Sequence, residues 1–306
     1  MSSNLKISEW FDIWYDSQTH IKQSTKSIYQ SYANKHLKPK MGTVRLKKLS
    51  RDLIQQFIDE LSIKLSSKTV RAVYSMLKLC LTAAYEKHLI GNVVDKICLP
   101  KTVSKDVKVL TKQEQKRLEQ VIEAENKEND IGILICLYTG IRIGELCALK
   151  WENINLDRKI MTIDKTMYSV QSNDGKCKTK IILSSPKSVN SERDIPIAEL
   201  LSEKLSKIQK SEGFVINRNG KYIDPAVYSR RYKKLLEKAG IEYMMFHSTR
   251  HTFSVRAREL GVDVQTLSEI LGHSSVSTTL NFYGHSLPEH KHNQMERIGG
   301  LFSQSK

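Results

Sequence analysis

The sequence lacks the features that mark membrane, secreted and disulfide-rich proteins. It contains no run of about 18 apolar residues, the length that a membrane-spanning helix requires. The N-terminus from Met1 to Trp10 has no apolar core of the kind found in signal peptides. The five cysteines are scattered, and no two of them form a C-x-x-C pair. We therefore expect a soluble, unsecreted protein whose thiols stay reduced in the cytosol.

Acidic residues are scarce relative to basic ones. The chain has 33 Asp and Glu residues against 49 Lys and Arg residues, which leaves a formal net charge of +16. Such an excess favours a polyanionic partner, usually nucleic acid, although charge alone leaves a membrane surface open. At 306 residues the chain also exceeds the size at which a single core usually stops growing, so two domains are expected.

The hydrophobic pattern divides the chain into two domains joined by a linker. Residues 1–95 show helical periodicity, as in the apolar repeat at i, i+3, i+4 and i+7 from Ile7 to Trp14. The period fails in residues 96–109, which form a short basic linker. A second domain follows over residues 110–285, and residues 286–306 form a tail with few apolar side chains.

The two domains differ in their predicted secondary structure. The first is all helical, and its second helix, Thr25 to Leu37, is expected to stop at Pro39. In the second domain, apolar and polar residues alternate between Lys159 and Ile197, which predicts a small antiparallel sheet with a turn at Asp174-Gly175. We thus predict a mainly α fold with a small antiparallel β-sheet (α+β). The helices expected around the sheet span residues 111–125, 131–138, 198–209, 225–239, 250–260, 264–271 and 275–283, with one more beginning at Arg142.

Many basic side chains project from the predicted elements of both domains. For any single lysine, a solvated surface position is the simpler interpretation. Together, beside a domain suited to phosphate chemistry, they suggest contacts to the DNA backbone. The candidate DNA-binding residues are Lys22, Lys26, Lys35, Lys47, Lys68, Arg71, Lys178 and Lys180.

The second domain contains side chains suited to cleaving a phosphodiester without a metal ion. That reaction needs cations on the phosphate oxygens, a nucleophile and a proton donor for the leaving oxygen. Arg142 and Arg250 are candidates for the cations, because a guanidinium group binds two phosphate oxygens and stays protonated. Lys187, in a loop before a predicted strand, can reach the leaving oxygen and donate the proton. Glu145 is expected to orient basic side chains rather than react.

Two histidines and a tyrosine complete this set. If the turn at His247 is helical, its side chain emerges on the same side as that of Arg250. His247 and His251 could in principle bind zinc, but no H-E-x-x-H pattern or nearby carboxylate accompanies them, so we expect no metal or other cofactor. His273 lies in a turn between helices, where a histidine usually packs or caps. Tyr283 becomes a feasible nucleophile only where cations stabilise its phenolate.

These motifs resemble the signature of the tyrosine recombinase (phage integrase) family. The resemblance covers nearly the whole chain and is strongest in residues 139–149, 185–197, 247–253 and 271–285. It implies a two-domain DNA clamp, with a helical, SAM-like core-binding domain before the catalytic domain. It also implies that Tyr283 attacks the scissile phosphate, giving a 3′-phosphotyrosyl link and a free 5′-hydroxyl without ATP or metal.

The resemblance assigns a role to each of the other candidates. Arg142 and Arg250 would hold the phosphate, and Lys187 would be the general acid. His247 and His273 would assist through hydrogen bonds. The expected partner is double-stranded DNA with a specific site, bound by a homotetramer that exchanges strands through a Holliday junction. The tail would pack on a neighbouring subunit, and a directionality factor or a host DNA-bending protein could take part.

Three departures from the family pattern leave the biological reaction open. The segment from His247 to Arg250 lacks a common aspartate-leucine pair, and the strand region before Lys187 is longer than in Xer-type enzymes. In this strand region the chain is more similar to integrases of phages and conjugative elements from Gram-positive bacteria. Those integrases have a small arm-binding domain before the core-binding helices, and this sequence starts with the helices. The chain is therefore expected to be either a compact recombinase or a piece of a longer one.

Integration or excision of a mobile element is therefore the expected reaction, and several alternatives remain. An Xer-type dimer-resolving recombinase would use the same residues. A type IB topoisomerase uses similar phosphotyrosyl chemistry but relaxes supercoils as a monomer. A non-catalytic DNA-binding protein would keep the fold alone, and a metal-dependent nuclease would lose activity with a chelator.

Overall fold

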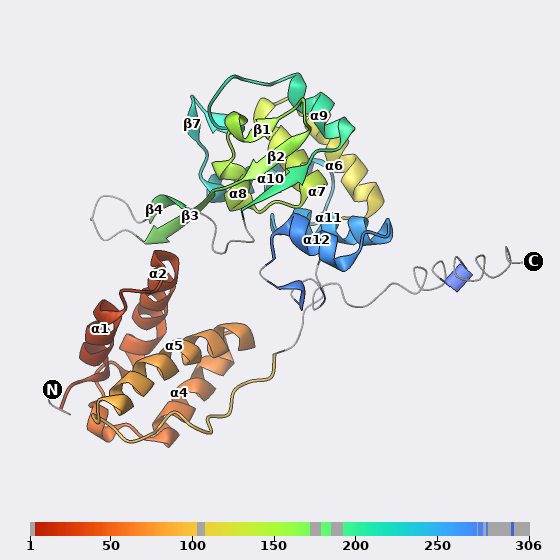
Figure 1. Ribbon diagram of the computed structural model, residues 1–306. Coiled ribbons are helices and arrows are strands. Elements are labelled where there is room, and N and C mark those ends of the chain that lie inside the picture. The colour runs from red at the N-terminus through yellow and green to blue at the C-terminus, as the bar shows by residue number, and fades with distance from the viewer. Residues whose placement is uncertain are drawn as a thin grey trace, which may run out of the picture. The chain divides into compact units, whose positions relative to one another are not determined.

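The computed structural model forms two compact units along the chain. It describes residues 4–102, 108–171, 179–184, 192–273, 275–277, 280 and 295–296. One unit is built mainly on residues up to Lys105 and the other mainly on those from Asp106 onward. Each has its own apolar core, and Figure 1 shows the first core wrapped by helices and the second by helices and strands. Within the described part of the chain, no helix combines the length and apolar character needed to cross a bilayer.

The first unit is a bundle of helices closed around aromatic and aliphatic side chains. Ser50 caps one of these helices, because its hydroxyl accepts a hydrogen bond from the backbone amide of Leu53. Trp10 is 1% exposed, and its indole nitrogen donates to the carbonyl oxygen of Cys80 at 2.9 Å, which ties the first helix to the last. The helices are α1 (Ile7–Ser17), α2 (Gln23–Tyr32), α3 (Lys38–Met41), α4 (Arg51–Lys64) and α5 (Ser67–Glu86), with a 3-10 turn at Leu46–Lys48.

The sequence prediction for the second helix is wrong at its end. Helical backbone does not stop at Pro39, because α2 passes into a π-helical turn (Ala33–Leu37) and α3 follows with Pro39 in its first turn. Proline is tolerated there since the first turn of a helix does not need its missing amide. The wider π turn resets the hydrogen-bond register before the proline. The chain leaves the helix at Gly42, whose amide donates to the carbonyl of Lys38.

Residues at the start of the predicted linker are held on the first unit. Gln55 exchanges two hydrogen bonds with the backbone of Cys98, at 2.8 and 3.1 Å. Arg71 Nε donates to the carbonyl of Pro100 at 2.9 Å, and the side chain of Leu99 packs against the core. The backbone up to Pro100 is therefore fixed by contacts within this unit.

The second unit combines helices with short strands. It begins with a capping box, in which the Thr111 hydroxyl accepts from the amide of Glu114 at 3.1 Å and the Glu114 carboxylate accepts from the amide of Thr111 at 2.8 Å. Its helices are α6 (Lys112–Glu125), α7 (Ile131–Thr139), α8 (Ile143–Ala148), α9 (Glu199–Ser206), α10 (Pro225–Lys238), α11 (Ser248–Glu259) and α12 (Val264–Leu271), with 3-10 turns at Glu128–Asp130 and Trp151–Asn153. Its strands are β1 (Ile154–Asn155), β2 (Ile160–Ile163), β5 (Arg193–Pro196), β6 (Asn217–Arg218) and β7 (Lys221–Tyr222). Two further strands, β3 (Thr166–Gln171) and β4 (Thr179–Ser184), are divided between the units, because Ser169–Lys180 groups with the first.

The predicted antiparallel pairing is confirmed, but the described strands do not form a single sheet. Strand β2 pairs with β1 on one edge and β5 on the other, with Ile163 opposite Arg193. Strand β3 pairs with β4 in a separate sheet, and β6 pairs with β7 in another. The turn predicted at Asp174-Gly175 lies outside the described residues.

Helix α7 lies at the centre of the second core and is buried on nearly all sides. Beside it, Tyr228 and Tyr232 of α10 are at most 1% exposed, and their rings pack edge-on against Phe246 at centroid distances of 5.7 and 5.1 Å. The Tyr228 hydroxyl also donates to the carbonyl of Asn129 at 2.6 Å. These contacts hold α7, α10 and the chain leading into α11, and so fix the turns described below.

The cysteines that the structure describes are free thiols. Cys80, Cys136 and Cys147 are buried, and Cys98 is exposed. Burial raises the pKa of each of the three buried thiols above its usual range, so they are protonated at neutral pH. They serve as small apolar side chains in the two cores.

Candidate active site

The two arginines predicted to hold a phosphate meet at one turn of the second unit. Arg250 of α11 donates from Nη1 to the carbonyl of Gly140 and from Nη2 to the carbonyl of Leu271, both at 2.8 Å. Arg142, which precedes α8, donates from Nη2 to the carbonyl of Gly272 at 3.2 Å. The turn after α7, the start of α11 and the end of α12 are therefore joined through these guanidinium groups.

The turn that carries Arg142 requires a glycine. Gly140 ends α7 with a φ of +69°, and a Cβ atom there would lie 2.5 Å from Cδ1 of Phe253. Both the left-handed backbone and the lack of space exclude a larger residue. Two residues later Arg142 is the N-cap of α8, and its side chain remains 36% exposed. The tight turn thus places a partly exposed cation over the buried core.

The C-terminal end of α12 presents three successive backbone carbonyl groups to three arginines. The last carbonyls of a helix have no hydrogen-bond partner within it and carry a partial negative charge. Guanidinium groups donate hydrogen bonds to these carbonyls and neutralise that charge. The donor and acceptor pairs are Arg193 Nε with Ile270 (2.6 Å), Arg250 Nη2 with Leu271 (2.8 Å) and Arg142 Nη2 with Gly272 (3.2 Å). The end of α12 therefore sets the spacing of these cations.

Glu145 is the buried anion of the site. It is 2% exposed, with Oε1 2.7 Å from Nη1 of Arg142 and Oε2 3.0 Å from Nη2 of Arg193. Its Oε2 also accepts a hydrogen bond from the backbone amide of Arg142 at 2.9 Å. Burial acts to raise the pKa of Glu145, but Arg193 and then Arg142 outweigh burial and hold that pKa below its usual range. The carboxylate is ionised at neutral pH and orients two cations.

The imidazoles beside these arginines are neutral at neutral pH. Burial, followed by Arg250 and Arg142, lowers the pKa of His273 to about 4. Burial, followed by His251 and Arg250, lowers the pKa of His247 to about 4, although His247 remains accessible to solvent. The rings of His247 and His251 pack edge to face with centroids 4.6 Å apart. A neutral imidazole can donate one hydrogen bond and accept another.

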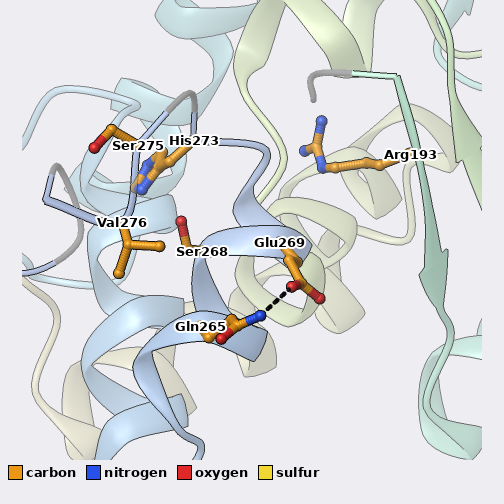
Figure 2. Close-up of a pocket in the computed structure, with 7 residues that line it drawn as sticks. All are labelled: Arg193, Gln265, Ser268, Glu269, His273, Ser275 and Val276. Atoms are coloured by element: carbon orange, nitrogen blue, oxygen red, sulfur yellow. Dashed lines mark hydrogen bonds between the residues drawn. The ribbon is translucent and has the colours of Figure 1, made fainter. Parts of the chain in front are cut away.

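A pocket of about 520 Å³ opens beside the end of α12. In Figure 2, His273 and Arg193 lie on opposite sides of it, and Gln265 donates a hydrogen bond to Glu269 on the helix between them. His273 follows Gly272, which ends α12 with a φ of +63° and turns the chain toward this space. The lining residues are Arg193, Gln265, Ser268, Glu269, His273, Ser275 and Val276.

The predicted catalytic residues that the structure describes form one cluster. Besides the contacts above, the charges of Arg250 and Arg142 act on the pKa of both His247 and His273, which places all four within electrostatic range. Lys187 and Tyr283 lie outside the described residues, and so does Lys178. Among the described residues, no group of three or more His, Cys, Asp or Glu side chains could hold a metal ion.

The predicted DNA-binding residues differ in their surroundings. Lys26 is half-buried, with Nζ 5.2 Å from the ring centroid of Tyr15. Arg71 is also half-buried and bonds Pro100, so it already has a structural contact. Contact of these side chains with DNA stays a prediction. The exposed members are Lys22, Lys35, Lys47, Lys68 and Lys180.

Sequence reasoning assigned no role to Arg193. The side chain is 7% exposed, pairs with Glu145 and bonds the end of α12. In the sequence it is one of several polar residues leading into a predicted strand, and such an arginine is usually solvated. The only available signal was the expectation that Glu145 orients basic side chains, which does not say which ones.

Comparison with known families agrees with this fold. Residues 108–290 match the phage integrase family, and residues 6–62 match the SAM-like N-terminal domain of phage integrase. The first match covers more than half of the chain and contains the whole arginine and histidine cluster. The chain belongs to the phage integrase family and is a tyrosine-type site-specific recombinase.

Its relatives include tyrosine recombinases, an integrase and a transposase. A "Tyrosine recombinase XerC-like" protein of Caldanaerobacter subterraneus subsp. tengcongensis is 30% identical over 78% of this chain and 67% of its own length. The ICEBs1 integrase of Bacillus subtilis is 26% identical over 94% of this chain and 79% of its own length. The transposase from transposon Tn916 of Enterococcus faecalis is 26% identical over 67% of this chain and 53% of its own length.

Solved structures with the same fold include those of two integrases. The Tn1549 transposon integrase in complex with a circular intermediate DNA matches with a TM-score of 0.81 at 19% identity, over 96% of this chain and 99% of that chain. A lambda integrase dimer bound to a core site matches with a TM-score of 0.68 at 18% identity, over 90% and 97%. At these identities the likeness shows the fold alone.

Proposed function

We propose that this chain catalyses the breaking and rejoining of DNA strands that integrates or excises a mobile element. The observation that carries the proposal is the convergence of Arg142 and Arg250 on the end of α12, beside His247 and His273. Cations and neutral imidazoles gathered at one point suit a phosphodiester, whose negative charge grows in the transition state. The ICEBs1 integrase aligns with 94% of this chain, which supports a mobile-element role over dimer resolution.

Tyr283 is the proposed nucleophile. Its phenolic O–H gives up its proton to water, and the phenolate oxygen, stabilised by the neighbouring cations, forms a bond to the scissile phosphorus while the bond from phosphorus to the 5′ oxygen breaks. The electron pair of that bond leaves with the 5′ oxygen, which takes a proton from Lys187. The product is a 3′-phosphotyrosyl link and a free 5′-hydroxyl. Attack by the 5′-hydroxyl of another strand reverses the step, so the energy of the phosphodiester bond is kept and no ATP is needed.

The described residues of the cluster hold the phosphate during this step. Arg142 and Arg250 neutralise its non-bridging oxygens, and Glu145 keeps Arg142 oriented through a 2.7 Å ion pair. His247 and His273, neutral at pH 7, each supply one N–H donor to the developing phosphorane. Three arginines, Arg142, Arg193 and Arg250, stand against one buried carboxylate, which leaves net positive charge for the substrate.

Double-stranded DNA with a specific site is the proposed partner. The net charge of +16 favours it, and the solved relatives are bound to DNA, as a lambda integrase dimer on a core site and a lambda integrase tetramer on a Holliday junction. A tetramer that exchanges two strands at a time is the matching assembly for this chain. A directionality factor or a host DNA-bending protein would then decide between integration and excision.

The experiment that tests the proposal detects the covalent intermediate. The protein is incubated in EDTA with nicked DNA carrying the end of its element and is then run on a denaturing gel beside Tyr283→Phe. We expect a protein–DNA band that forms only with Tyr283, while both proteins bind the DNA with affinities within about a factor of three. A band of equal strength with Tyr283→Phe would show that another residue is the nucleophile.

The same assay separates the alternatives. Tight DNA binding without a band indicates a non-catalytic DNA-binding protein, and cleavage that EDTA abolishes indicates a metal-dependent nuclease. A band accompanied by relaxation of supercoiled DNA without a specific site indicates a topoisomerase. Recombination between two element ends in the same buffer is the outcome that supports the proposed function.

A further inference from the structure

Arg193 connects two parts of the second unit that lie far apart in the sequence. Its backbone is fixed in strand β5, where it pairs with Ile163 of β2. Its side chain is 7% exposed and extends from the strand toward α12, as Figure 2 shows. A long, flexible side chain is held in one position here, because strand pairing fixes one end and burial fixes the other.

The guanidinium group of Arg193 bonds both α8 and α12. Nε donates to the carbonyl of Ile270 at 2.6 Å, and Nη2 donates to Oε2 of Glu145 at 3.0 Å, with Nη1 3.4 Å from Oε1. The planar fork of arginine allows these contacts at once, which a single ammonium group could not make in the same geometry. Arg193 therefore sets the distance between the carboxylate and the end of α12.

The backbone of Gly272 lies directly against this guanidinium group. A Cβ atom on Gly272 would be 2.8 Å from Nη1 of Arg193 and 3.0 Å from its Cζ. Gly272 also accepts a hydrogen bond from Arg142 and is followed by His273. A movement of Arg193 would thus displace Gly272. That displacement would reach Arg142 and His273, which lie on either side of the proposed phosphate position.

We propose that Arg193 is a positioning residue for DNA cleavage, one that holds the turn from Ile270 to His273 against Glu145 so that His273 meets the phosphate. This inference rests on the proposed function. Arg193 is not itself a phosphate ligand, because its described contacts are to Glu145 and Ile270 and its side chain is buried. Its influence on the reaction passes through His273 and through Glu145 to Arg142.

The first test replaces Arg193 with glutamine and with lysine. Single-turnover cleavage of nicked DNA should fall about 100-fold in Arg193→Gln, the size of effect that a displacement of about 1 Å has on a positioned group. The cleavage rate of Arg193→Lys should fall less, because lysine keeps the charge and one hydrogen bond. DNA affinity should change by less than about threefold in both. Arg158→Gln, which removes an exposed arginine from the turn between β1 and β2, is the matched control and should cleave normally.

A double-mutant cycle separates positioning from a merely structural role. His273→Ala is combined with Arg193→Gln, or with Arg193→Lys if the glutamine variant does not fold. If Arg193 acts through His273, Arg193→Gln should cost markedly less in the His273→Ala background than in the wild type, with only the part carried by Glu145 and Arg142 remaining. Multiplicative losses in the double variant would show that Arg193 acts elsewhere and would overturn the inference. Absence of a covalent band in the wild type would instead contradict the proposed function.

Discussion

Glu145 and Arg193 form a buried ion pair, with Oε2 and Nη2 3.0 Å apart and side-chain exposures of 2% and 7%. Such a pair is stable only when further hydrogen bonds satisfy both partners, because each charge loses its hydration. Here the amide of Arg142 donates to the carboxylate, and the carbonyl of Ile270 accepts from the guanidinium. The pair is thus one part of a network that reaches from α8 to the end of α12.

Removing the charge of Glu145 should destabilise the protein strongly. In Glu145→Gln the cations of Arg142 and Arg193 lose their common anion, and breaking a buried pair typically costs about 3–5 kcal/mol. Urea unfolding measures the change. Glu199→Gln is the control, because Glu199 pairs with Lys159 on the surface and an exposed pair contributes about 0–1 kcal/mol. Equal losses in the two variants would mean that the buried network adds no stability.

Alanine substitutions at two glycines should distinguish the effect of backbone strain from the effect of a steric clash. Gly261 and Gly272 both have positive φ, at +86° and +63°, but a Cβ atom meets nothing within 4 Å at Gly261 and meets Arg193 at 2.8 Å at Gly272. Gly261→Ala should lower the free energy of unfolding by about 1–2 kcal/mol through backbone strain alone. Gly272→Ala should lower it further, and DNA cleavage should slow only in that variant. Thermal unfolding and single-turnover cleavage give the two readouts, and slow cleavage in Gly261→Ala would contradict the assignment.

Lys187 is proposed to protonate the leaving 5′ oxygen, and a chemical substitution in the DNA tests this role. Lys187→Ala should cleave ordinary DNA about 100-fold or more slowly, within the usual range for loss of a general acid. DNA with a sulfur in place of the scissile 5′ oxygen needs no proton on its leaving group, so the variant should cleave it at nearly the wild-type rate. The ratio of the two rates is measured in single-turnover experiments. Equal defects on both substrates would remove Lys187 from the general-acid role.

The low pKa of His273 makes stability depend on pH. The pKa is about 4 in the folded protein and 6.5 in its ordinary state, so the unfolded chain binds more protons between these values. The contribution of this neutral imidazole to the free energy of unfolding is complete above pH 6.5 and is lost as the pH falls toward 4. In His273→Gln, the decrease of the melting temperature from pH 6.5 to 4 should therefore be smaller than in the wild type. His20→Gln, an exposed control, should keep the wild-type slope, and an unchanged slope in His273→Gln would contradict the prediction.

The sequence predicted most helices because their signals are local. Ser50 caps α4, Thr111 and Glu114 form the capping box of α6, and Gly140 ends α7, each decided within a few residues. The cluster of Arg142 with Arg250 was inferred from family motifs, since periodicity alone does not bring α8 and α11 together. The roles of the predicted catalytic residues remain proposals, because Lys187 and Tyr283 lie outside the described residues.

The features that could not be predicted depend on tertiary contacts. Helical backbone continues past Pro39 because a π turn precedes it, and no particular residue type predicts a π turn. The separation of β3 and β4 from the other strands is a matter of tertiary pairing, which the alternation of apolar and polar residues does not specify. Arg193 became significant only through its distance to Glu145, a partner from another element.

The three carbonyl groups at the end of α12 have a consequence for the energetics of DNA recognition. Guanidinium groups repel one another, and here the helix end and one carboxylate offset that repulsion with contacts made inside the protein. The arginines are therefore ordered before any DNA arrives, so little conformational entropy remains to be lost at this point upon binding. Binding free energy from the rest of the interface can then be used to bend the duplex and to hold its strands in place for exchange.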